Sequence, residues 1–461
     1  MGLYRFFPTH DTFISSNTTI SANNRVTGSN FGASPTLQVY KVTSSYPYSD
    51  AELARSLLNF DFRQLSGLVF NDQSIPPAGV SYVLKCADYQ VGDAVPHSYD
   101  LSVCAISGTT WDEGIGQDDK TYLDAGVANW VNASSTTPWV SGGGDYYRAN
   151  SGSQHFDAGE ENLEVDVTAI VQSWLSGTIP ANGLMVKLSD ACESNQNDYW
   201  RKVFYSRETH IVEKTPFLEA RWNDVRKDNR GNFAFNAPNA LFLYNVVRGS
   251  LVNAANAPLT VRLQDNWIGA SASFQQTFSA SLQETGVYAA AINITSSNPN
   301  TFSSSWIDIW TDSTGRCLLT GSFQPLILTG SQVDQYNDFV VSVTNLKRVY
   351  RSDERARLLV NVRQNYFNDQ LVVHTASLDT QVAYMEDMYY SVVNNETGET
   401  VIPFGTGSVP YTKLSYNDDG NYFQLGMSSF VPGFVYRFMF LINYNKYEKN
   451  IIDNKFIFKV V

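Results

Sequence analysis

The alternation of apolar and polar residues changes period within residues 163–188. Leu163, Val165 and Val167 are apolar and the positions between them are polar, so one side of this segment is apolar. A period of two is typical of a strand with one buried face. We therefore predict that a strand opens this stretch.

The period becomes that of a helix at Thr168, a residue type that favours the N-cap position. Gly177, about two turns later, suits a helix end. A helix this short needs a sheet to pack on. It is the only helix that the pattern predicts, and a turn at Asn182-Gly183 leads into a second apolar strand. The apolar residues that set the four-residue spacing form the pairs Ile170–Trp174 and Val171–Leu175.

Short alternating or apolar runs, separated by polar turns, fill the rest of the chain and predict an all-β fold. A chain of 461 residues is too long for one hydrophobic core, so we expect several domains. The pattern of strands and turns predicts three tandem β-sandwich domains, at 1–222, 233–329 and 330–461. Residues 223–232 are charged and non-periodic, which is typical of a linker. The last two domains have the strand rhythm of immunoglobulin-like sandwiches. Tyr288 follows the Gly286 turn, as in a tyrosine corner.

Composition narrows the classes of partner. The net charge of −13 argues against a nucleic-acid backbone or an anionic membrane as principal partner. No apolar run reaches transmembrane length, and the first residues do not have the pattern of a signal peptide, so we expect neither membrane insertion nor export by that route.

The cysteines and histidines indicate neither a zinc site nor an enzyme. No CxxC or Cys/His spacing occurs. Cys86 and Cys104 are either partners across neighbouring strands or, the favoured interpretation, small buried side chains. No histidine lies in a GxSxG or HExxH frame, so the sequence predicts no catalytic residue and a non-enzymatic protein. The histidines are His10, His97, His155, His210 and His374.

A long loop region, residues 109–155, carries two kinds of candidate binding residue. Its carboxylates are hard oxygen ligands that could hold a structural Ca²⁺, but their spacing is not that of an EF-hand, and a solvated acidic loop is the favoured interpretation. Its aromatic rings could stack on sugars, or could form the small core that a long loop needs, which is again favoured. The calcium candidates are Asp112, Glu113, Asp118 and Asp119, and the glycan candidates are Trp111, Trp130, Trp139 and Tyr146.

A series of short motifs, in a fixed order along residues 1–222, resembles the DNRLRE-type domain. That resemblance implies a β-sandwich related to secreted carbohydrate-binding modules. The long loop, with its GIGQDD, ANW and GGGDYY elements, looks more like the variant found in virion proteins of tailed phages. The motifs are Asp11-Thr12, Asn30-Phe31-Gly32, RSLLNFDF, Trp111-Asp112-Glu113-Gly114, VDVTAIVQSWLSG, Asn182-Gly183-Leu184 and Phe204-Tyr205-Ser206-Arg207-Glu208.

Two functions follow as expectations. The first is a structural component of a tailed-bacteriophage virion, in the tail, baseplate or neck, assembled in the host cytoplasm and contacting other virion proteins and copies of itself. The second is a carbohydrate-binding adhesin or tail-fibre protein that recognises host surface glycans. A secreted bacterial wall protein is disfavoured because it needs a signal peptide, and the first residues do not have that pattern.

Overall fold

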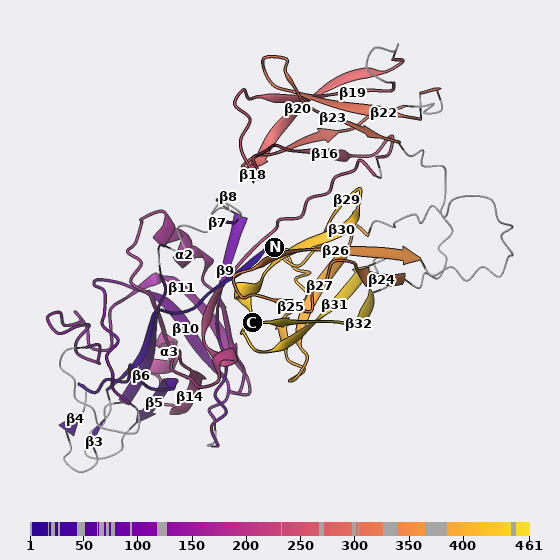
Figure 1. Cartoon of the computed structure of the whole chain (residues 1–461). Helices are drawn as coiled ribbons and strands as arrows, with labels where there is room; N and C mark the ends of the chain where they lie inside the picture. Colours follow the sequence, from indigo (N-terminus) through magenta and orange to yellow (C-terminus); the bar gives the residue numbers. More distant parts are fainter. Residues whose placement is uncertain are drawn as a thin grey trace. The chain divides into compact units, whose positions relative to one another are not determined.

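The computed structural model divides into two compact units (Figure 1). Unit 1 comprises Met1–Gly2, Val69–Ile75 and Asn223–Val461, and unit 2 comprises Leu3–Leu68 and Pro76–Trp222. The structure describes residues 2–461 except 17, 20–23, 26–27, 44–50, 62, 64–68, 71–72, 75–78, 93–94, 118–126, 232, 267–271, 297–300, 303, 326–338, 365–384 and 444–448.

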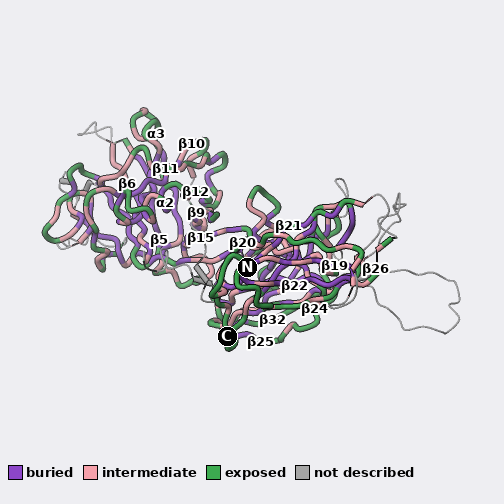
Figure 2. Tube along the Cα trace, turned by 90° about the horizontal axis from the view of Figure 1, so that it is seen from above, coloured by how far each residue is buried: buried purple, intermediate pink, exposed green. Residues whose placement is uncertain are grey.

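Strands dominate both units, which confirms the predicted β class. Figure 2 shows buried stretches in strands such as β6 (Ala51–Asn59), whereas other strands, such as β20 (Gln275–Glu284), are largely exposed. Within the described residues no helix is long and apolar enough to span a membrane. The helices described are α2 (Thr168–Leu175), α3 (Asp190–Ser194) and the short 3₁₀ turns η2 (Val212–Lys214) and η4 (Met427–Ser429).

Unit 2 contains two larger antiparallel sheets. One has the order β1 (Leu3–Phe6), β15 (Phe217–Trp222), β9 (Val80–Cys86) and β12 (Leu163–Asp166). The other has the order β11 (Tyr146–Phe156), β10 (Tyr99–Ile106), β13 (Leu184–Leu188), β6 (Ala51–Asn59), β5 (Thr36–Thr43) and β14 (Tyr199–Tyr205), with β2 (His10–Ser15) also paired to β6. Two short hairpins are β3 (Thr18–Thr19) with β4 (Asn24–Arg25) and, in unit 1, β7 (Val69–Phe70) with β8 (Gln73–Ser74).

The second sheet of unit 2 is covered on both faces. Leu57 and Leu58 are neighbours in β6 and so point to opposite faces, yet neither is exposed. At Gly152 of β11 the two sheets approach closely, because an added Cβ there would lie 2.5 Å from the Asp166 carbonyl oxygen of β12. Apolar residues on both sides of a strand explain why β13 reads as a continuous apolar run apart from Lys187.

Helix α2 forms where the period of four predicted it, but its start differs. Thr168 is the first helical residue and Val167 precedes it as the cap. The Thr168 hydroxyl accepts the Tyr82 backbone N–H at 2.8 Å, while the Asp166 carboxylate accepts the Thr168 backbone N–H at 2.8 Å. The predicted cap is therefore wrong, because the Thr168 side chain bonds strand β9 instead. Trp174 is buried in α2, and α3 was not predicted.

The middle of unit 1 forms one six-stranded sheet with an aromatic core. Trp306 and Trp310 of β22 are both fully buried in that core. The order is β16 (Asn239–Tyr244), β21 (Val287–Ile292), β20 (Gln275–Glu284), β19 (Leu259–Gln264), β22 (Trp306–Thr311) and β23 (Cys317–Phe323), beside a hairpin of β17 (Val246–Val247) and β18 (Ser250–Leu251).

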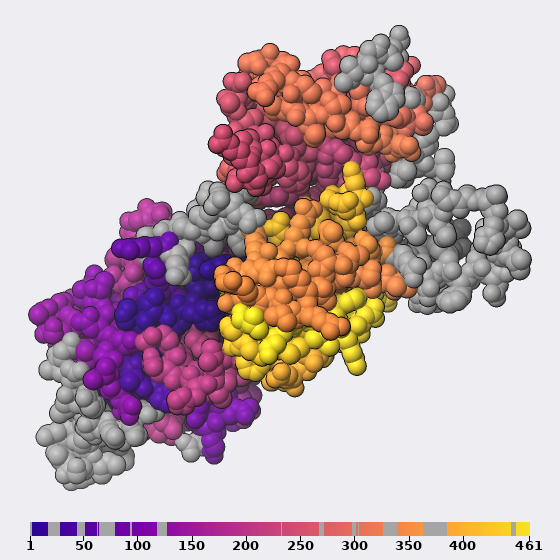
Figure 3. Space-filling model, in the orientation of Figure 1, coloured from indigo at the N-terminus to yellow at the C-terminus, as the bar shows by residue number. Residues whose placement is uncertain are grey.

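The C-terminal part of unit 1 has two sheets joined by aromatic packing. Phe423 of one sheet stacks on Tyr390 of the other, with ring centroids 4.4 Å apart. In Figure 3 the orange and yellow surfaces of this part adjoin, and β25 pairs with β32 in parallel. One sheet has the order β24 (Phe339–Val343), β26 (Arg355–Gln364), β30 (Gly420–Gly426) and β29 (Ser415–Asn417). The other has the order β25 (Val349–Tyr350), β32 (Lys449–Val460), β31 (Val435–Asn443), β27 (Met388–Asn394) and β28 (Thr400–Ile402).

Residues 223–231 of the predicted linker hydrogen-bond to strands of unit 1. Asp228 donates its backbone N–H to Tyr416 of β29, and Arg230 pairs with the buried Asp308 of β22 at 2.7 Å. Asn232 and the predicted boundary at 329/330 lie outside the described residues. The division into three domains stays a prediction.

Candidate functional site

Asn30 joins motif segments that are far apart in the sequence. Its side-chain amide donates to the backbone oxygens of Glu113 and Ala128, both at 2.8 Å. Its side-chain oxygen accepts the backbone N–H groups of Gly32 and Gly116, at 3.2 and 2.9 Å. All four bonds are made by a residue with no exposed surface. Asn30 therefore fastens the long loop to the body of unit 2.

Gly32 shows how closely the loop approaches this segment. A Cβ added to Gly32 would lie 2.2 Å from the Glu113 carbonyl oxygen, far inside contact distance. The glycine of the Asn30-Phe31-Gly32 motif is thus required by the close approach of two backbones.

Three charged motif residues meet beside Asn30. Arg207 contacts both carboxylate oxygens of Glu113, at 3.0 and 2.8 Å. Asp11 accepts the Arg207 backbone N–H at 2.6 Å and donates its own backbone N–H to Glu113 at 2.8 Å. Asp11 is almost completely buried, and this burial raises its pKa to about 7. One Asp11 carboxylate oxygen has no hydrogen-bond partner in the part of the chain that the structure describes.

The predicted calcium ligands do not come together among the described residues. Glu113 turns its carboxylate toward Arg207, and Asp112, which precedes it, is exposed. Asp118 and Asp119 lie outside the described residues. Over the described ranges, no group of three His, Cys, Asp or Glu side chains is placed to hold a metal ion. The solvated acidic loop, which the sequence favours, and the alternative of a Ca²⁺ site both stay predictions.

Two of the four predicted glycan-binding rings form the core of the loop. Trp111 and Trp139 are each 5% exposed. Their indole N–H groups donate to the backbone oxygens of Asn182 and Asn129, at 3.0 and 2.9 Å. These rings pack with Ile14, Leu57, Ile106, Ala128, Ala133 and Met185. Neither ring offers a face to a sugar.

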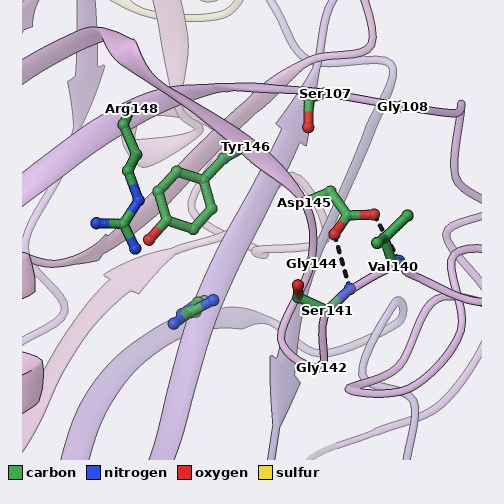
Figure 4. Close-up of a pocket in the computed structure, with 10 residues that line it drawn as sticks. Ser107, Gly108, Val140, Ser141, Gly142, Gly144, Asp145, Tyr146 and Arg148 are labelled. Carbon is green, nitrogen blue, oxygen red and sulfur yellow. Dashed lines mark hydrogen bonds between the residues drawn. The ribbon is translucent and has the colours of Figure 1, made fainter.

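The other two rings, Trp130 and Tyr146, are half-buried beside a pocket of about 450 Å³. Figure 4 shows Tyr146 and Arg148 on one side of the pocket and the turn at Asp145 on the other. The Asp145 carboxylate holds that turn by accepting the backbone N–H groups of Val140 and Ser141, at 2.7 and 2.9 Å. The lining residues are Arg55, Ser107, Gly108, Val140, Ser141, Gly142, Gly144, Asp145, Tyr146 and Arg148.

An ionic network extends from Arg55, one of the residues that line this pocket. Arg55 makes a two-point contact with Glu193, at 3.0 and 2.8 Å, and donates to the Gly143 backbone oxygen at 2.8 Å. Lys187, which is 1% exposed, pairs with Glu193 at 3.1 Å and with Asp190 at 2.8 Å. The hydrogen bond from Lys187 holds the pKa of Asp190 below its usual value. Paired in this way, the charges keep the pocket walls in place.

Cations already surround the Tyr146 ring. Lys187, Arg55 and Arg148 lie 5.1, 5.6 and 5.9 Å from its centroid. The ring faces are therefore engaged by the protein, and Tyr146 acts as a wall more than as an open stacking platform. The hydroxyls of Ser107 and Ser141, the Asp145 carboxylate and the exposed Arg148 guanidinium supply polar groups for hydroxylated ligands.

The network was not foreseen from the sequence. Its members come from β6, β11, β13 and α3, and Arg55 and Glu193 are 138 residues apart. One signal was available. Arg55 and Lys187 are charges inside strands that are otherwise largely apolar, and a charge at such a position needs a partner.

Two comparisons with known proteins found no relative of this chain. No known family matches the chain in a scan against family models, and a search of curated proteins finds no significant match.

Proposed function

We propose that the chain is a non-enzymatic structural component of a tailed-bacteriophage virion, in the tail, baseplate or neck. In this proposal three tandem β-sandwich domains, the first of the DNRLRE type and the next two immunoglobulin-like, assemble with copies of the chain and other virion proteins. The supporting observation is the convergence of Asp11, Asn30, Glu113 and Arg207 into one cluster.

The convergence supports the resemblance for a physical reason. Asp11 and Arg207 are 196 residues apart, and a chance likeness of short motifs would not make such residues each other's partners. The cluster also uses its polar groups internally. Asn30 makes four bonds within unit 2, and Glu113 is occupied by Arg207 and Asp11. Such a cluster holds a scaffold together, which suits a structural role.

Quantitative mass spectrometry of purified particles tests this proposal. Particles produced by the genome that encodes the chain should contain it in a fixed ratio to the major capsid protein, and the ratio should survive repeated purification. Loss of the chain on purification, or its absence from the particles, would contradict the proposal.

The pocket beside Tyr146 favours a second candidate function, recognition of a surface glycan. Its mixture of aromatic wall, hydroxyls, carboxylate and guanidinium is the chemistry that binds sugar hydroxyls. Trp130, which lies 5.3 Å from the Arg55 guanidinium, is the second ring at this place. A virion component could carry such a site, so the two functions are compatible.

A glycan array tests the second candidate. We expect wild type to bind a limited set of glycans and Trp130→Ala to bind them more weakly. Val212→Ala, which changes an exposed residue of unit 2 away from the pocket lining, should bind like wild type. No binding by wild type would remove this candidate and leave the virion proposal standing.

A further inference from the structure

A second cavity, of about 350 Å³, opens on β5, β6 and β14 of unit 2 (Figure 1 labels these strands). Its lining is chemically different from that of the Tyr146 pocket, because it consists of aromatic and acidic residues with one valine. The lining residues are Tyr40, Val42, Glu52, Asp198 and Trp200.

The strand register explains why these side chains share one face. Tyr40 and Val42 are two positions apart on β5 and so point the same way. Glu52 of β6 is directly opposite Val42 in the antiparallel pair, which puts its side chain on that face too. Trp200 lies where the pairing of β14 with β5 shifts register, between Tyr199 and Lys202.

Trp200 and Tyr40 form an aromatic corner. Their ring centroids are 4.9 Å apart and the planes are inclined by 60°. Tyr40 is held from behind by a 2.6 Å hydrogen bond between its hydroxyl and Ser15. Trp200 remains 44% exposed despite these contacts, so its ring has surface available to a ligand.

The charge at this corner is negative. Asp198 accepts the Thr43 backbone N–H at 2.6 Å and is otherwise exposed. Glu52 forms no ion pair with any described residue, and after burial its charge is one of the causes that raise the pKa of Tyr40. Arg201 is the nearby cation: its guanidinium lies over the Trp200 ring, 5.2 Å from the centroid, and it is also bonded to Gln38. An incoming cation would therefore use the part of the Trp200 ring that remains exposed. Two carboxylates and one guanidinium leave the corner with a net charge of about −1 at neutral pH.

An aromatic corner with excess carboxylate charge favours one ligand chemistry. The faces of Trp and Tyr rings attract cations, and an alkylated ammonium gains most because little hydration is lost when it leaves water. A compact inorganic cation would need oxygen ligands on several sides, which five residues with two carboxylates do not supply. A neutral sugar would gain from the ring and nothing from the charge.

We propose that the corner formed by Tyr40 and Trp200, with Glu52 and Asp198, is a binding site for a quaternary ammonium group. Trp200 supplies the cation–π contact, and the two carboxylates supply the compensating charge. Tyr40, which is only 4% exposed, supports the Trp200 ring and offers almost no ring surface of its own. The site does not depend on the glycan pocket or on the virion proposal, because it uses none of the residues that carry them.

Calorimetric titration of the whole chain with choline and with its neutral isostere, 3,3-dimethylbutan-1-ol, tests the site. The two ligands match in shape and differ in charge. Choline should bind in the millimolar range, and the isostere should bind at least about tenfold more weakly if the ring–cation contact is the driving interaction.

Variants separate the two parts of the site. Trp200→Ala should weaken choline binding by about tenfold through loss of the cation–π contact. Glu52→Gln keeps the shape and should weaken it by about fivefold through loss of charge. Val212→Ala, exposed and outside the lining, should leave it unchanged. Circular dichroism checks that each variant is folded.

Three results with choline and its isostere would overturn the inference. They are no choline binding in the millimolar range, equal binding of choline and the isostere, or full choline binding by folded Trp200→Ala or Glu52→Gln. Binding of neutral sugars at this corner in place of choline would also overturn it and would leave a sugar platform as the interpretation.

Discussion

Replacing Asn30 by alanine removes four hydrogen bonds from a fully buried position without adding bulk. The variant leaves the backbone oxygens of Glu113 and Ala128 and the backbone N–H of Gly116 without the partner that Asn30 supplied. A buried hydrogen bond contributes about 1 kcal/mol net, so the four together amount to about 4 kcal/mol of the free energy of unfolding. That loss is a large fraction of the stability of an ordinary domain.

Urea unfolding followed by tryptophan fluorescence measures this loss, because Trp111 and Trp139 lie in the loop core that Asn30 fastens. Asn150→Ala is the matched control, since among the described residues that side chain makes one hydrogen bond, to Ser173 at 3.2 Å, and its loss should cost about 1 kcal/mol. Asn30→Asp keeps the acceptors, loses both donors and places a carboxylate against two carbonyl oxygens, so we expect it to be at least as destabilising as Asn30→Ala. Equal, small losses for Asn30→Ala and Asn150→Ala would refute the claim that Asn30 fastens the loop.

Three further predictions test the same unit. Gly32→Ala should destabilise it severely or prevent folding, because the new Cβ would meet a loop backbone oxygen at 2.2 Å, whereas Gly92→Ala, with nothing within 4 Å, should melt like wild type. Stability should fall as pH rises from about 4 to about 7, by up to about 4 kcal/mol, because the folded state keeps a proton on Asp11, whose pKa burial raises to about 7, while the unfolded chain releases it. Asp11→Asn should flatten this slope in urea midpoints measured across that window, and an unchanged slope would contradict the assignment. Arg55→Met should cost about 3 kcal/mol in urea unfolding by leaving the nearly buried Glu193 with fewer partners, and a wild-type midpoint would show that the network contributes little.

The local sequence pattern was sufficient to predict helix α2 but not to predict which residue caps it. The four-residue spacing of Ile170 and Trp174 is set by residues within one turn of each other, so the sequence carries it in full. The role of Thr168 is set by Tyr82, 86 residues away, and no local pattern reports such a contact. Helix α3 has five residues, too few to show a period.

The candidate site also depends on contacts between residues far apart in the sequence, which no local pattern reports. The sequence identified Trp111 and Trp139 and left two interpretations open, and only their burial decides for the loop core. Arg55 was visible as a charge within an apolar strand, but Glu193, its partner across 138 residues, was not. Trp200, the exposed ring at the second cavity, lies at a register shift between strands, which depends on pairing and not on the order of residues in β14.

Immuno-electron microscopy of purified particles tests the central proposal most directly. Antibodies against the chain are applied to particles produced by the genome that encodes it, with particles lacking the gene product as the control. The proposal predicts label at one fixed position, in the tail, baseplate or neck, on most particles. Label that is absent from intact particles and confined to free protein in the lysate would contradict it.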